Sequence, residues 1–192
     1  TISDPAGNIP DNLTHSAVSD NSSVKVDTIR PSVDNFTISD TEFKIGDNAT
    51  VTLVFSEAVC TVSDCGGNIF SNADITSDNG TLTTMSSQAN DNETWIGTFT
   101  PNDNTEDNSS RLSLAASYTD PAGNPGYDNQ TENYEIDTLA PTVNSVAITD
   151  ADGDQTHGGF GYVNATDNVS VTATFREAVI FDNASITPTI TL

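Results

Sequence analysis

Apolar and polar side chains alternate over several short stretches of the chain. In Val51–Phe55, the residues Val51, Leu53 and Phe55 share one face, with Thr52 on the other. Alternation with a period of two is typical of a strand that buries one face. Further strands are predicted by Phe36/Ile38, Trp95/Gly97/Phe99, Leu112/Leu114/Ala116/Tyr118, Val24/Val26 and Tyr134/Ile136, and more weakly over 69–75 and 81–85. The predicted class is all-β.

Three motifs occur twice, in the same order and 110 to 120 residues apart. They are Asp-Pro-Ala-Gly-Asn (4–8 and 120–124), Val/Ile-Asp-Thr-x-x-Pro (26–31 and 136–141), and a Val-Thr-x-x-Phe strand followed by Glu-Ala-Val (51–59 and 171–179). Such self-similarity predicts tandem domains. We expect residues 1–27 to hold the C-terminal strands of one domain, 28–137 a complete domain, and 138–192 the N-terminal strands of a third.

About seven short strands per repeat, separated by Asn, Asp, Gly and Pro turns, are typical of an immunoglobulin-like β-sandwich. Together the three motifs resemble the bacterial and archaeal immunoglobulin-like (Big-type) tandem repeats of large surface proteins. The resemblance implies spacer or lattice domains, often with calcium at their junctions. Because Pro31 and Pro141 stiffen short connections, we expect a rod.

The end pieces lack enough strands for a two-sheet core of their own. One interpretation is that the chain is an excerpt of a longer protein. The other is that neighbouring copies complete each other's domains head to tail. This second interpretation is weakened because the two pieces together lack a strand equivalent to Trp95–Phe99. The expected partners are copies or neighbouring domains of the same protein, through self-association.

The chain is strongly acidic, with 28 Asp and Glu against 5 Lys and Arg and a formal net charge of −23. This excludes nucleic acid and anionic membrane surfaces as expected partners, because both require basic side chains. No apolar run approaches the roughly 18 residues of a membrane span. The excess of acidic over basic side chains favours calcium binding, with a merely solvated acidic surface as the alternative.

Two kinds of calcium site are predicted. Asp150, Asp152 and Asp154 alternate around Gly153, as at the start of an EF-type loop, but Gly161 stands where that loop needs a glutamate. The alternative is a solvated acidic turn. The second kind would gather carboxylates at domain junctions, from Asp4, Asp27, Asp40, Asp120, Asp137 and Asp150. The alternative there is Asx-turn chemistry.

Glycosylation sequons are twice as frequent as the roughly five expected by chance. They occur at Asn12, Asn21, Asn35, Asn48, Asn79, Asn92, Asn108, Asn129, Asn164, Asn168 and Asn183. We expect N-linked glycans on an exported surface, against accidental sequons in a chain rich in Ser, Thr and Asn. Cys60 and Cys65 predict a small disulfide and an oxidising compartment.

No pattern indicates catalysis. His15 and His157 lie in polar stretches without a recognisable nucleophile, and Glu57 and Glu177 recur at equivalent strand ends, which indicates architecture. We therefore expect a non-enzymatic, extracellular, structural glycoprotein at the cell surface, similar to an archaeal surface-layer, sheath or filament protein. The alternative is the calcium-stiffened stalk of a bacterial adhesin. Carbohydrate binding has no aromatic platform to support it.

Overall fold

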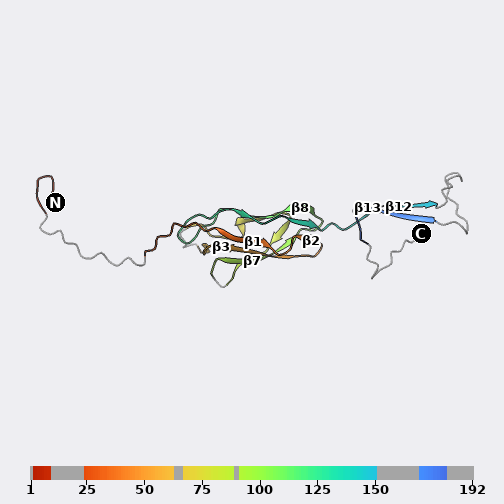
Figure 1. Cartoon of the computed structure of the whole chain (residues 1–192), viewed down its shortest axis with the longest axis horizontal. Coiled ribbons are helices and arrows are strands. Elements are labelled where there is room, and N and C mark those ends of the chain that lie inside the picture. Colours follow the sequence, from red (N-terminus) through yellow and green to blue (C-terminus); the bar gives the residue numbers. More distant parts are fainter. Residues whose placement is uncertain (1, 10–23, 63–66, 89–90, 151–168, 181–192) are drawn as a thin grey trace.

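The computed structural model describes residues 2–9, 24–62, 67–88, 91–150 and 169–180. Residues 33–137 form an all-β sandwich, and the chain enters it at one end and leaves at the opposite end (Figure 1). A two-stranded hairpin follows. The predicted all-β, immunoglobulin-like class is confirmed.

One layer of the sandwich is an antiparallel sheet in the order β1-β3-β7-β5, with β6 also paired to β7. Its strands are β1 (Val33–Ile38), β3 (Ala49–Phe55), β5 (Gly80–Leu82), β6 (Ser86–Ser87) and β7 (Thr94–Pro101). The predicted alternation holds here, because Val51, Leu53 and Phe55 on β3 are all at most 1% exposed.

The facing layer consists of two three-stranded sheets, in the orders β10-β9-β4 and β2-β11-β8. Their strands are β2 (Glu42–Lys44), β4 (Ile75–Ser77), β8 (Glu106–Ser110), β9 (Leu112–Leu114), β10 (Asn129–Gln130) and β11 (Tyr134–Asp137). Only Arg111 separates β8 from β9, so one stretch of chain serves both sheets. The β11 strand pairs in parallel with β2 and antiparallel with β8.

Aromatic side chains fill the core in two groups. Phe43, Phe99 and Tyr134 pack with ring centroids 5.0 to 5.6 Å apart. The second group lies at the C-terminal end of β3, where contacting rings have centroids 4.9 to 6.1 Å apart. It consists of Phe55, Phe70, Trp95 and Tyr118. Edge-on and tilted ring pairs of this kind stabilise a core beyond the area they bury.

Two predicted strands are shorter than the alternation indicates. The stretch 69–75 contains a 3₁₀ turn, η1 (Asn72–Asp74), because Ser71 and Asp74 form a reciprocal capping box and strand pairing starts only at Ile75. The strand predicted to continue through Ala116 ends at Leu114, the partner of Ile75. Ala116 is exposed as a result.

The hairpin pairs β12 (Val143–Asp150) with β13 (Val169–Phe175). Its register has the same irregularity as the β1–β3 pair, since Val143 faces Phe175 as Val33 faces Phe55. The segment predicted as a strand at Val24 and Val26 is not one, and these side chains are 69% and 87% exposed.

Candidate metal centre at the entrance to the sandwich

Three carboxylates meet where the chain enters the sandwich. The carboxylate oxygens of Asp27, Glu57 and Asp120 all lie within 4.8 Å of one another. Asp27 is exposed, Glu57 is half-buried and Asp120 is fully buried. Among the residues that the structure describes, this is the one group of three or more potential metal ligands of this kind.

The bend after β3 positions Glu57. The Ser56 amide donates to the Ser32 carbonyl at 2.9 Å, and the Ser32 amide donates to the Ser56 hydroxyl at 3.0 Å. These bonds tie the end of β3 to the start of β1. Because β1 follows the entering segment directly, Glu57 lies at the same end of the sandwich as Asp27.

The Asp-Pro-Ala-Gly-Asn turn positions Asp120. Its Oδ1 accepts the Asn124 amide at 2.8 Å, and its Oδ2 accepts the Asn124 side-chain amide at 2.7 Å. That side-chain amide also donates to the Asp27 carbonyl at 3.3 Å. The turn therefore contacts the entering segment while it holds a buried carboxylate in place.

One carboxylate oxygen of Glu57, Oε1, is buried without a hydrogen-bond partner within the described part of the chain. Burial, with added repulsion from Asp27, Asp120 and Glu93, raises the pKa of the Glu57 carboxyl above its ordinary value of 4.5. A buried, unpartnered carboxylate oxygen is costly unless a proton or a cation satisfies it.

The donor set fits a hard cation. Calcium takes carboxylate and carbonyl oxygens, and three converging carboxylates supply charge without nitrogen or sulfur ligands. No basic side chain forms an ion pair with the group, since the one ion pair recorded among the described residues joins Lys44 to Asp47 on a distant turn. Asp27, Glu57 and Asp120 would hold calcium, which would supply the missing positive charge.

The structure brings together only two of the predicted junction aspartates. Asp40 lies at the opposite end of β1, roughly 20 Å from its start for a six-residue strand, and its Oδ1 accepts the Glu42 amide at 3.1 Å. Its grouping with Asp27 is wrong, because the first strand carries the chain from one pole to the other. Asp137 lies at the exit, where its Oδ1 accepts the Leu139 amide at 3.2 Å.

The other predicted ligands are placed as follows. Asp4 forms the same turn as Asp120, because its carboxylate accepts the amides of Ala6 and Asn8 and the Asn8 side chain. The Asn8 side-chain amide is the main cause that lowers the pKa of the Asp4 carboxyl. Asp150 ends β12, and Asp152 and Asp154 lie outside the described residues.

Glu57 was interpreted from the sequence as architecture and missed as a candidate ligand. A signal was available, because Glu57 follows the last buried residue of β3 by two positions. Pairing that strand with β1 places its end at the entrance, next to the aspartate of the Val/Ile-Asp-Thr motif.

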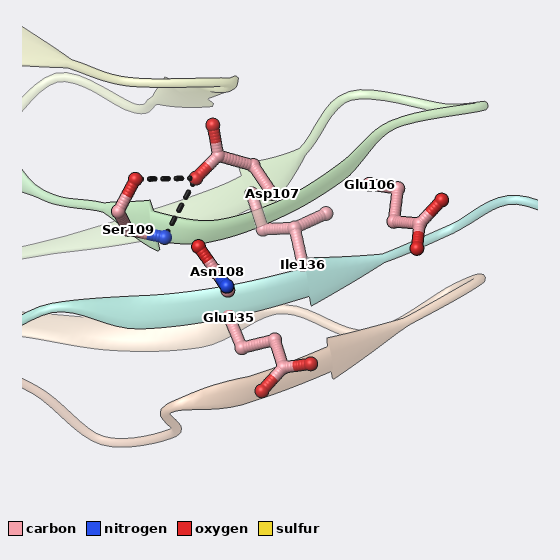
Figure 2. A pocket seen from close by; sticks show the side chains of 6 residues that line it. All are labelled: Glu106, Asp107, Asn108, Ser109, Glu135 and Ile136. Atoms are coloured by element: carbon pink, nitrogen blue, oxygen red, sulfur yellow. Dashed lines mark hydrogen bonds between the residues drawn. The ribbon is translucent and has the colours of Figure 1, made fainter.

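A second region, a cleft of about 360 Å³, lies on β8 and β11. It is lined by Glu106, Asp107, Asn108, Ser109, Glu135 and Ile136 (Figure 2). Both the amide and the hydroxyl of Ser109 donate to Asp107 Oδ1, at 2.7 and 3.1 Å, and these bonds lower the pKa of the Asp107 carboxyl. Figure 2 shows the Glu106 and Glu135 carboxylates pointing away from Asp107. These carboxylates do not converge on a ligand.

The sequons differ in accessibility. Asn35, Asn48, Asn108 and Asn129 are exposed. Asn92 is half-buried, as is Asn79, whose side-chain amide donates to Asp107 Oδ2 and Ser110 Oγ at 3.1 and 3.0 Å. Asn12, Asn21, Asn164, Asn168 and Asn183 lie outside the described residues.

Cys60 is fully buried and takes part in a disulfide bond. Cys65, the only other cysteine of the sequence, lies outside the described residues. Within the described ranges no helix is long and apolar enough to cross a membrane.

The comparisons with known proteins concern the sandwich. No curated protein and no solved structure matches the chain. One family, described as bacterial Ig-like domain, matches residues 27–136, a stretch that includes all three carboxylates of the entrance group. This domain is a structural, non-catalytic fold that typically occurs in cell-surface proteins. The match covers more than half of the sequence, so the chain belongs to the bacterial Ig-like domain family.

Proposed function

We propose that this chain is a structural segment of an extracellular surface protein, a stiff spacer of Ig-like repeats whose junctions are bridged by calcium. The family supports a structural role at the cell surface. The path of the chain supports a spacer, because the chain enters and leaves the sandwich at opposite ends (Figure 1). Successive domains joined in this way extend a rod.

The observation that carries the proposal is the meeting of Asp27 with Glu57 and Asp120. Asp27 belongs to the junction segment, whereas the other two residues belong to the sandwich. A calcium ion bound to all three would tie the junction to the domain. It would also reduce the repulsion among three carboxylates, none of which forms an ion pair with a basic side chain of the described residues.

Thermal unfolding in calcium and in excess chelator tests the proposal. At a calcium concentration 100 times the dissociation constant, binding stabilises the folded state by about 2.7 kcal/mol. For a domain of this size we expect the melting temperature to rise by about 10 °C, and magnesium to reproduce little of the rise. Glu57→Gln should abolish the calcium-dependent rise, and Asp40→Asn should preserve it. An equal melting temperature in calcium and chelator contradicts the calcium bridge.

The setting of the spacer has two candidates. Exposed sequons at Asn35, Asn48, Asn108 and Asn129 favour an N-glycosylated surface layer, sheath or filament. Intact-mass analysis of the native protein, with glycan masses expected at these asparagines, tests this first candidate. Unmodified asparagines together with a calcium-dependent rise in melting temperature would favour the alternative, an adhesin stalk.

A further inference from the structure

The entering segment is bound to the sandwich by a basic side chain as well as by the carboxylate group. Arg30 Nε donates to the Pro125 carbonyl at 2.6 Å, and a terminal nitrogen of its guanidinium donates to the Gly126 carbonyl at 2.7 Å. The guanidinium carbon lies 3.9 Å from the centroid of the Tyr127 ring. One side chain thus binds three consecutive residues of the loop 120–127.

This geometry uses properties specific to arginine. The guanidinium is a rigid planar fork, so two of its N–H groups can reach two neighbouring carbonyls at once. Its flat face also stacks on an aromatic ring, where it interacts with the ring's negative face. A lysine in its place would keep the charge but could not reproduce the paired bonds.

The loop presents its carbonyls in a fixed arrangement. The Gly126 amide donates to the Tyr118 carbonyl at 2.9 Å, and the buried Tyr118 hydroxyl donates to the Tyr127 carbonyl at 2.9 Å. A Cβ at Gly126 would lie 2.2 Å from the Tyr118 ring, so only glycine allows this approach. The backbone that carries the two carbonyls bound by Arg30 is therefore fixed by hydrogen bonds to Tyr118 and by close packing against its ring.

The exit of the sandwich shows a different anchor. Thr138 is buried, and its hydroxyl donates to the Asn102 carbonyl at 2.7 Å while accepting the Thr105 amide at 2.9 Å. The residue before the proline there is Ala140, whose side chain has no donor. The contact made by Arg30 at the entrance cannot be repeated at that position.

We propose that Arg30 is a latch that fixes the entering segment on the loop 120–127 and so sets the direction of the preceding chain without a bound cation. The latch places Asp27 beside Glu57 and Asp120, because only two residues separate Asp27 from Arg30. A junction held in this way is preorganised, which makes the carboxylate group a better ligand for a cation than a mobile segment would be.

Distance measurements between two spin labels test the latch in the whole 192-residue chain. One label replaces Lys25 in the entering segment, and the other replaces the exposed Asn108 on β8, both as cysteine variants. Arg30→Ala should broaden the distance distribution at least twofold relative to the parent protein, with Arg30→Lys between the two. Lys44→Ala removes an exposed cation at the other end of the sandwich and should change nothing.

Measurement in calcium and in chelator separates the latch from the proposed calcium bridge. We expect a narrow distribution in chelator for the parent protein and a broad one for Arg30→Ala. A parent distribution that is narrow only in calcium would overturn the latch, as would an Arg30→Ala distribution as narrow as the parent. Broadening by Arg30→Ala without any calcium effect would support the latch and refute the calcium bridge. Unchanged Trp95 fluorescence verifies that each variant keeps its folded sandwich.

Discussion

The strand pairs β1–β3 and β12–β13 share the Val-Thr-x-x-Phe motif and the same register, yet they differ in burial. Phe55 on β3 is 1% exposed, whereas the equivalent Phe175 on β13 is 38% exposed. Val51 and Val171 differ in the same way, at 0% and 36%. Pairing of two neighbouring strands is therefore a local property of the sequence. Burial of their apolar face depends on a second layer, which the described residues supply only for the first pair.

The largest expected change in the free energy of unfolding comes from a substitution in the core. Replacing Phe55 by alanine removes a ring packed against Phe70 and Tyr118, and should lower the free energy of unfolding by about 3–5 kcal/mol. Phe175→Ala is the matched control and should change it by less than about 0.5 kcal/mol. Urea unfolding followed by the fluorescence of Trp95, the single tryptophan, measures both. Equal losses of unfolding free energy in the two variants would mean that Phe55 and Phe175 are equally buried in solution.

An intermediate effect on stability is expected for residues that follow β3 and β13, where the two copies of the motif differ in sequence. Cys60 is buried and disulfide-bonded, whereas the equivalent residue of the later repeat is Ile180, which is 99% exposed. Replacing Cys60 and Cys65 together by serine should cost about 2 kcal/mol, because the expected bond closes a short loop. Ile180→Ser should have no effect on the same urea transition. A double variant as stable as the parent would show that the bond does not stabilise the sandwich.

The smallest effect concerns the pH dependence of the metal-free protein. The pKa of Glu57 is raised, so the folded state binds this proton more tightly than the unfolded chain does. The contribution of Glu57 to stability is therefore fully present below the ordinary pKa of 4.5, and is lost as pH rises through the higher pKa of the folded state. In chelator, Glu57→Gln should remove this loss of stability above pH 4.5.

The matched control for this measurement is Glu177→Gln, at the equivalent position of the later repeat. It should leave the pH dependence of the sandwich as it is in the parent protein. Melting temperatures across the pH range measure both variants. A parent protein whose pH dependence is the same as that of Glu57→Gln would show that the buried carboxylate does not titrate in this range.

The sequence allowed much of the sandwich to be predicted and less of the site. Alternation located β3, β7 and β11, because each strand buries every second residue against one core. It failed at Ala116 and over 69–75, where a side-chain cap and the end of strand pairing outweigh the apolar pattern. Of the candidate site, Asp27 and Asp120 were chosen from the repeated motifs, whereas Glu57 was missed and Asp40 was wrongly grouped with Asp27.

By itself, the sequence determined the class of fold and the local turns. These depend on neighbouring residues, as in the matching carboxylate bonds of Asp4 and Asp120. Only the tertiary structure decided which carboxylates meet, that β11 pairs in parallel with β2, and that Arg30 reaches the loop 95 residues later. Such contacts depend on which ends of the strands share a pole, and that is fixed when the two layers pack over a common core.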